Sequence, residues 1–262
     1  TRAGAGTLDV DAGAVDLYGQ FTINGSSLIR LASDSDIRLI GRALTVESTD
    51  GGQQSSRQVG RLNTSSSIEL DAAQVYPTTR TDFTIAVRAQ PTDAPVAGGA
   101  IRVTDNGASP GSVYSAGGKL TLQADTIQQS GRLLAPLGEI DLRADTALDL
   151  AAGSLTSVSA DGLTVPYGRT VSGILWRYVD GGVTPPTTLN DVTDAGKRIS
   201  FSAPAVDVQD GAVIDLSGGG NVQAVEFVPG SGGDADITRA ANTYAVIPSA
   251  NLQLSPYDRD TQ

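Results

Sequence analysis

The segment Gly118-Lys119-Leu120-Thr121-Leu122-Gln123-Ala124-Asp125-Thr126 is followed, 20 residues later, by the near copy Gly138-Glu139-Ile140-Asp141-Leu142-Arg143-Ala144-Asp145-Thr146. In this alignment Leu120 matches Ile140, and Leu122 matches Leu142. A fixed period of about 20 residues, with a short strand and turn residues in each copy, is typical of a β-solenoid. Because one coil cannot bury its own apolar face, it needs copies stacked above and below it. The repeat therefore predicts a rod built from stacked strands.

The same alternation of apolar and polar residues recurs along most of the chain. A period of two predicts strands with one buried and one solvated face. Gly, Ser, Asn and Asp lie between these segments and favour turns. No segment carries a helical apolar stripe over three turns, so the sequence predicts an all-β fold. The predicted strands are residues 8–10, 15–17, 21–23, 37–39, 44–46, 68–70, 83–87, 101–103, 120–122, 140–142, 148–150, 199–201, 206–208 and 213–216.

Three segments interrupt the alternation and are predicted to be loops. Residues 49–67 are polar and rich in Gln and Ser, residues 91–99 are rich in Pro, Ala and Gly, and residues 161–197 are the longest. A long insertion in a solenoid projects from one face, where binding surfaces often form. We therefore expect a β-solenoid over residues 1–220 with these loops, and an irregular C-terminal end or cap over residues 221–262.

Composition excludes several classes of protein. The chain has 262 residues, a formal net charge of −11 and a hydrophobic fraction of 39%, which is too high for a disordered chain. An acidic surface repels phosphates, so no nucleic-acid partner is expected. The chain lacks Cys and His, which removes thiolate chemistry and the commonest general base and transition-metal ligand. We predict no cofactor, and no membrane insertion, because no apolar window approaches the roughly 18 residues of a bilayer span.

Several segments carry a more specific signal, of which Asp215-Leu216-Ser217-Gly218-Gly219-Gly220-Asn221 is the most telling. The others are residues 72–79 with 83–85, 115–122, 134–138, 161–168, 226–233 and 244–249. Over nearly its whole length the chain resembles the large two-partner-secretion exoproteins of the filamentous haemagglutinin type, which are adhesins of Gram-negative bacteria. The family's N-terminal secretion motif is not visible here, and the chain begins without a signal peptide, so we expect a fragment or a processed piece.

The resemblance implies a right-handed parallel β-helix that is exported to the cell surface through an outer-membrane transporter partner. It implies a structural shaft of a secreted adhesin or fibre, which mediates cell adhesion, aggregation or filament formation and is not an enzyme. The family has no catalytic residues to transfer to this chain. The expected partners are the transporter, a receptor or glycan on a host or neighbouring cell, and a second copy of the chain, because both ends of an isolated solenoid expose strand edges.

Aromatic residues of the 161–197 segment form the candidate ligand or partner surface, namely Trp176, Tyr178 and Tyr167. Aromatic rings can stack on a sugar or a protein partner, and they can equally pack down as a local core. Both alternatives stay open at the level of sequence. The stacking alternative would make the chain a carbohydrate-binding module.

Acidic residues supply the remaining candidates. Asp234 and Asp236 lie in a Gly-Gly-Asp-Ala-Asp segment and are the candidate calcium ligands, although Asp also suits turns. Paired carboxylates also keep open a β-helical polysaccharide-degrading enzyme as an alternative function. The 20-residue register would stack Asp125 about 5 Å from Asp145, where like charges repel. On this basis Asp125→Asn is expected to be neutral or slightly stabilising.

Overall fold

The computed structural model describes residues 4–46, 55–89, 94–171, 175–178, 187–188 and 197–225. These residues contain strands and no helix, which confirms the all-β prediction for the described part and leaves it without a helix that could cross a membrane. The strands are β1 (Gly6–Ala12), β2 (Val15–Tyr18), β3 (Gln20–Ile23), β4 (Ser26–Ser33), β5 (Asp36–Ile40), β6 (Arg42–Val46), β7 (Ser55–Thr64), β8 (Ser67–Asp71), β9 (Gln74–Pro77), β10 (Thr81–Val87), β11 (Ala100–Thr104), β12 (Lys119–Gln129), β13 (Arg132–Leu134), β14 (Glu139–Leu150), β15 (Leu155–Ser157), β16 (Thr164–Val171), β17 (Leu175–Tyr178), β18 (Thr187–Thr188), β19 (Arg198–Ser202), β20 (Ala205–Val208), β21 (Val213–Asp215) and β22 (Asn221–Val225).

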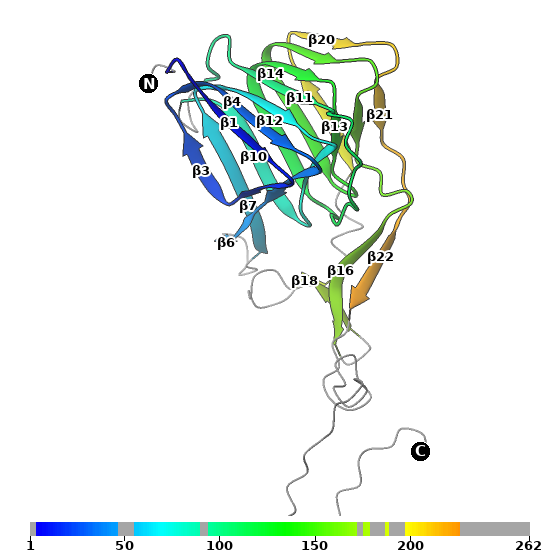
Figure 1. Cartoon of the computed structure of the whole chain (residues 1–262). Helices are drawn as coiled ribbons and strands as arrows, with labels where there is room; N and C mark the ends of the chain where they lie inside the picture. The colour runs from blue at the N-terminus through cyan, green and yellow to red at the C-terminus, as the bar shows by residue number, and fades with distance from the viewer. Residues whose placement is uncertain are drawn as a thin grey trace, which may run out of the picture.

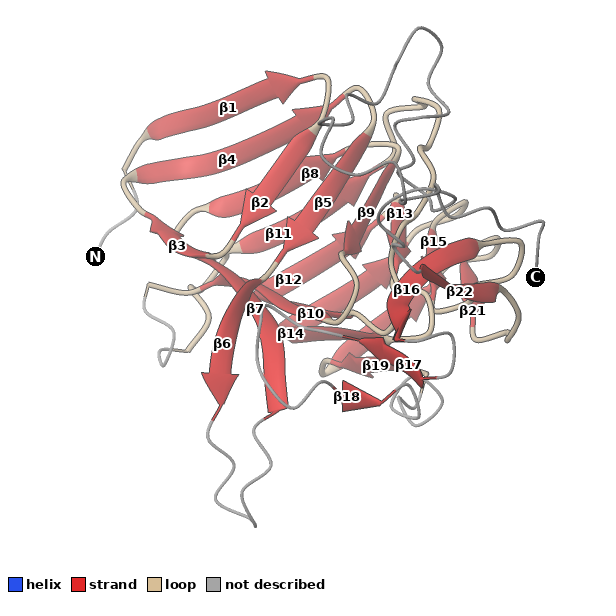
Figure 2. Cartoon of the chain, turned by 90° about the horizontal axis from the view of Figure 1, so that it is seen from below, coloured by secondary structure: helices blue, strands red, loops and turns tan. Residues whose placement is uncertain are grey.

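The strands form a 12-stranded sheet, a 6-stranded sheet in the order β2-β5-β9-β13-β15-β21, and a 4-stranded sheet of β18, β17, β16 and β22. Almost all neighbours in the two larger sheets are parallel. Figure 2 shows β1, β4, β8 and β11 side by side as one row, with β2, β5 and β9 as a second row. β3, β7 and β10 form a third row. From β1 to β11, consecutive strands other than the antiparallel pair β6 and β7 belong to different rows, so the chain winds around and returns to pair with its own previous turn. We call each such turn a coil.

The coils share a register that tolerates insertions. Arg38 of β5 bonds Asp16 of β2 across 22 residues, whereas Arg198 of β19 bonds Glu139 of β14 across 59 residues. β12 and β14 each run through a corner of the coil, since the first part of β12 pairs with β10 and its last part with β11. This continuity joins the row of β1, β4, β8 and β11 to the row of β3, β7 and β10, and together they make the 12-stranded sheet. Parallel coils stacked in this way are compatible with the predicted β-solenoid.

Aliphatic ladders fill the space between the rows. Leu120 pairs with Ile140 and Leu122 with Leu142, which confirms that the 20-residue repeat is a spatial register. Each of these side chains is fully buried, and complete burial of a Leu or Ile contributes about 1.5–3 kcal/mol. One ladder crosses six strands through Phe21, Leu62, Ile85, Leu122, Leu142 and Phe201.

The expectation of a surface loop over residues 49–67 does not hold for Ser55–Thr64, which form β7. This strand pairs in parallel with β3 and β10 and antiparallel with β6. Within this strand Leu62 is fully buried, and Thr64 Oγ1 accepts a hydrogen bond from the Ser66 N–H at 2.9 Å. Residues 94–99, within the second expected loop, lie outside any strand.

The described part of the expected 161–197 insertion forms β16, β17 and β18, which pair antiparallel to one another. β22 pairs in parallel with β16, so Asn221–Val225 are a strand of this small sheet and not an irregular end. Figure 1 shows β16 and β22 side by side, apart from the larger sheets. The rest of the expected C-terminal cap, residues 226–262, lies outside the described residues.

Candidate functional site

The structure separates the three aromatic candidates. Tyr167 is only 1% exposed and packs with Ala116 and Val165 in a small second core, where Arg80 donates to its hydroxyl at 3.2 Å. The packing alternative therefore applies to Tyr167, which is not part of a binding surface. Trp176 and Tyr178 lie in β17, whose side chains are outside the described part of the chain.

The acidic candidates do not gather into a metal centre within the described ranges. No group of three or more His, Cys, Asp or Glu side chains there could hold a metal ion. Asp234 and Asp236 lie outside the described residues. The calcium interpretation of these two residues therefore stays a prediction.

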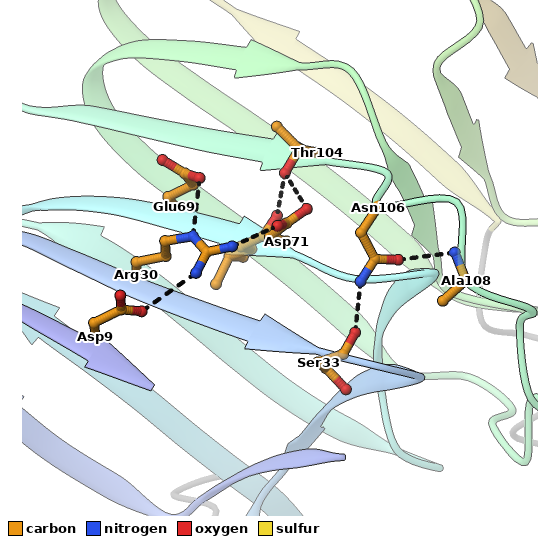
Figure 3. A network of polar contacts seen from close by, with 9 residues as sticks. Asp9, Arg30, Ser33, Glu69, Asp71, Thr104, Asn106 and Ala108 are labelled. Atoms are coloured by element: carbon orange, nitrogen blue, oxygen red, sulfur yellow. Dashed lines mark hydrogen bonds and ion pairs between the residues drawn. The ribbon is translucent and has the colours of Figure 1, made fainter. Parts of the chain in front are cut away.

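Charged residues on the outer faces are instead paired across neighbouring coils. Arg30 of β4 lies 3.4 Å from Asp9 of β1, and 3.5 and 3.0 Å from Glu69 and Asp71 of β8 (Figure 3). The hydrogen bond that Arg30 donates to Asp71, together with the charge of Asp9, raises the pKa of Arg30. Thr104 of β11 also donates to Asp71 at 2.8 Å. This network ties four adjacent strands together, and it leaves Arg30 committed to structural contacts.

A groove of about 660 Å³ lies on the outer face of β13 and β15, the face opposite to the buried Leu133. Its floor holds Arg132, Leu134, Leu155 and Ser157. One wall is the loop between β11 and β12, and the other is the turn that leads into β16. Besides the floor, the groove is lined by Gln74 of β9, Pro110, Gly111, Ser112, Val113, Tyr114, Pro136, Ser159, Asp161, Gly162, Leu163, Thr164 and Asp215 of β21.

The loop wall is held by hydrogen bonds at several points. Gly111 N–H donates to Asp36 Oδ1 at 3.2 Å, and Gln74 Nε2 donates to the Gly111 carbonyl at 2.9 Å. Asn106 donates to the Ser33 carbonyl at 2.7 Å, further along the same loop (Figure 3). Next to this anchor, burial and the charge of Asp36 raise the pKa of Tyr76 to about 12. The wall is thus fixed to β5 and β9 before any ligand arrives.

The turn wall is held by a second set of polar contacts. Asp215 accepts hydrogen bonds from the Ser217 hydroxyl at 2.6 Å, from the Ser217 N–H at 2.9 Å and from the Ser157 hydroxyl at 3.1 Å. The Ser217 bonds lower the pKa of Asp215, so it is a carboxylate at neutral pH. Ser159 Oγ adjoins this set, since it lies 2.9 Å from Ser217 Oγ.

Two groove residues stand apart from these contacts. The Nε atom of Arg132 is buried and has no hydrogen-bond partner, and Arg132 forms no ion pair among the described residues. Tyr114 is 61% exposed, and it also lines a neighbouring groove of about 300 Å³ with Gln58, Thr78 and Thr81. The groove is a candidate binding site because it is lined both by Arg132 and by the exposed ring of Tyr114.

Sequence reasoning did not single out this groove. Its floor and walls come from segments far apart in the chain, which only the coil register brings together. The available signal was the Gly, Pro and Ser-rich stretch 105–118, which holds Tyr114 between two predicted strands. Comparisons with models of protein families, with curated proteins and with solved structures found no match.

Proposed function

We propose that this chain is a right-handed parallel β-helix that serves as a shaft segment of a secreted bacterial surface adhesin or fibre, of the filamentous haemagglutinin type. The observation that supports it best is the unbroken parallel pairing of β1, β4, β8, β11, β12, β14 and β20. In such a stack each coil bonds only its neighbours, so length can be added without a new core. That property suits a shaft segment, whose role is to extend the protein away from the cell.

The proposed mechanism is mechanical. Backbone hydrogen bonds run along the axis of the stack, where they would carry a pulling load in parallel. Buried ladders such as Leu122–Leu142 hold adjacent coils in register, and outer charges such as Lys119, Glu139 and Arg198 alternate in sign from coil to coil. The shaft would hold a binding or effector region of the parent protein away from the cell.

Export, localisation and partners form part of the same proposal. A surface shaft has to pass an outer-membrane transporter, and it then meets a receptor or glycan on another cell. A polysaccharide-degrading enzyme is the less favoured alternative, because the acidic residues Glu139 and Asp141 are paired with Arg198 and Arg143.

Deletion in the bacterium that encodes the chain tests the proposal. The segment is removed in frame, and the exported amount of the parent protein is measured by quantitative blotting. We expect adhesion to host or neighbouring cells to fall while export is unchanged, and immunogold labelling of the intact protein to lie outside the outer membrane. Label confined to the cell interior, or full adhesion without the segment, would rule the shaft role out.

A depolymerisation assay tests the enzyme alternative separately. The purified chain is incubated with acidic polysaccharides, with and without Ca²⁺, and new reducing or unsaturated ends are counted. A shaft produces none, whereas a lyase or hydrolase produces them in proportion to the amount of protein.

A further inference from the structure

The groove over β13 and β15 combines apolar and polar surface in one site. Leu134, Leu155 and Val113 supply apolar surface, while Arg132 and Asp161 bring charges of both signs. Its volume of about 660 Å³ lies within the range of ligand sites, which is about 300–1,000 Å³. The site is therefore large enough for an organic ligand, and its lining is not that of a purely hydrophobic docking surface.

The charges of the groove favour an uncharged ligand. Arg132 brings one positive charge, but Asp215 is ionised and Asp161 adds a second carboxylate on a chain of net charge −11. An anionic polymer would meet repulsion from this surface. A neutral ligand with many hydroxyl groups can accept from the guanidinium and donate to the carboxylates without bringing a charge.

The position of Tyr114 favours a ligand that is a chain. This side chain lies on the boundary between the 660 Å³ groove and the 300 Å³ groove, since it lines both. An exposed aromatic face offers a stacking surface for the C–H face of a sugar ring, and the hydroxyl can bond to the same ligand. A linear ligand could thus cross Tyr114 and contact both grooves.

Both walls are positioned in advance, which reduces the ordering cost of binding. Gly111 is bonded to Asp36 and Gln74 on one side, and Ser159 is bonded to Ser217 on the other. We propose that this groove binds a linear, uncharged oligosaccharide, with Arg132 donating to its hydroxyl groups and Tyr114 stacking on one ring. The inference goes beyond the shaft role and does not depend on it.

Isothermal titration of the whole chain with three neutral probes tests the proposal: maltohexaose, cellohexaose and N-acetylchitohexaose. We expect saturable binding of at least one probe. Tyr114→Ala should weaken it by roughly tenfold or more, because a stacking partner is lost, while Tyr114→Phe keeps the ring and most of the affinity. Tyr18→Ala is the matched control, because Tyr18 is 63% exposed and does not line the groove.

Arg132→Met tests the polar half of the site. It keeps an unbranched apolar stem and removes the donors, so binding should fall while the melting temperature is retained. Arg102→Met is the control, because Arg102 is exposed on another row of strands. The proposal is overturned if no probe binds at millimolar concentration, if affinity survives both Tyr114→Ala and Arg132→Met, or if heparin binds at Arg132 in place of the neutral probes.

Discussion

Gly60 occupies a core position of β7 at which the next strand supplies Phe83. A Cβ atom on Gly60 would lie 2.1 Å from Phe83 Cδ2, so the ring of Phe83 fills the space that the glycine leaves. β7 was missed because residues 49–67 are polar and rich in Gln and Ser, a composition that favours a surface loop. The core of this coil is shaped by a complementary pair that a single-residue pattern does not detect.

Gly60→Ala should therefore destabilise the protein by about 1–3 kcal/mol through overpacking. Urea unfolding measures the change, and Gly13→Ala is the control because nothing lies within 4 Å of its Cβ position. Adding Phe83→Leu should make the double variant less destabilised than the sum of the two single variants. Strict additivity would show that the two residues are not in contact.

Gln129 is a polar residue in an otherwise aliphatic ladder. It is fully buried between Val103 and Leu150, and its amide bonds the N–H and carbonyl of Gly131 and the carbonyl of Leu155. The side chain thus satisfies backbone groups at the corner where β12 turns into β13. Neither its burial nor this role is visible in the alternation of the sequence.

Gln129→Leu should cost about 1–3 kcal/mol in spite of its greater hydrophobicity, because the Gly131 N–H loses its partner inside the protein. Chemical unfolding checks the value. The exposed neighbour Gln128 provides the control, since Gln128→Leu should change the free energy of unfolding little. Equal effects of the two substitutions would contradict the role assigned to Gln129.

Asp125 and Asp145 do not form the expected pair of stacked carboxylates. The register between β12 and β14 shifts after Ala124, and Thr146, not Asp145, meets Asp125. Asp125 also accepts a hydrogen bond from the Gly98 N–H at 2.6 Å, and the bonds from Thr146 and Gly98 lower its pKa. The carboxylate caps backbone and hydroxyl donors, so the expectation that Asp125→Asn is neutral no longer follows.

Asp125→Asn should lower the melting temperature at neutral pH, because an amide nitrogen cannot accept one of the two hydrogen bonds. The pKa of Asp125 in the folded protein is lowered from its ordinary value of 3.8. The difference in melting temperature between the variant and the parent protein is therefore complete above that pH, and it shrinks as the pH falls through the folded pKa. Asp145→Asn is the control, since Asp145 is exposed. A difference that stays constant down to acidic pH would contradict this assignment.

At the scale of the element, the coil is the unit of the structure. The repeat between residues 118 and 146 allowed the pairing of β12 and β14 to be predicted, because both copies carry complete apolar pairs at matching positions. The other coils carry insertions of different length, so their register is set by long-range pairing that a fixed period cannot reveal. The groove was missed for the same reason, because Arg132 and Tyr114 line one groove only when the coils are stacked.

Deletion of residues 119–138 should remove one whole coil and leave a folded protein. Glu139 would then take the place of Lys119, and Ile140 and Leu142 would meet Phe83 and Ile85 in place of Leu120 and Leu122. We expect a cooperative melt at a lower temperature, because one neighbour interface is lost.

Circular dichroism of this variant is compared with that of a deletion of residues 119–128 alone. The shorter deletion interrupts the ladders and should abolish cooperative unfolding. If both deletions unfold the chain, or both leave it intact, the coil is not the structural unit.

At the scale of the whole molecule, the two ends of the described stack present similar surfaces. Leu8 of β1 is exposed at one end, and Val206 and Val208 of β20 are exposed at the other. Apolar ends favour the predicted self-association, but a parallel end-to-end contact in register would bring Asp9 close to Asp207, and like charges oppose it. Self-association therefore stays a prediction whose strength depends on salt.

The outward-facing positions of β1, β4, β8, β11, β12, β14 and β20 form a ladder along which the length of the stack can be measured. It runs through Asp9, Arg30, Glu69, Arg102, Gln128, Asp149 and Asp207. Successive positions are separated by very different lengths of chain, yet each should be one strand spacing further along the axis. The absence of native Cys allows pairs of spin labels to be placed on this ladder without other changes.

Pulsed electron spin resonance on these pairs tests the stacked coils most directly. With one label at Asp9→Cys and the second at Gln128→Cys, Asp149→Cys or Asp207→Cys, Cα separations of roughly 19, 24 and 29 Å are expected from a spacing of about 4.8 Å per strand. The step from Asp149 to Asp207 should match the step from Gln128 to Asp149, although the whole 161–197 segment intervenes. Distances that follow sequence separation, or that fail to rise from pair to pair, would contradict the stack.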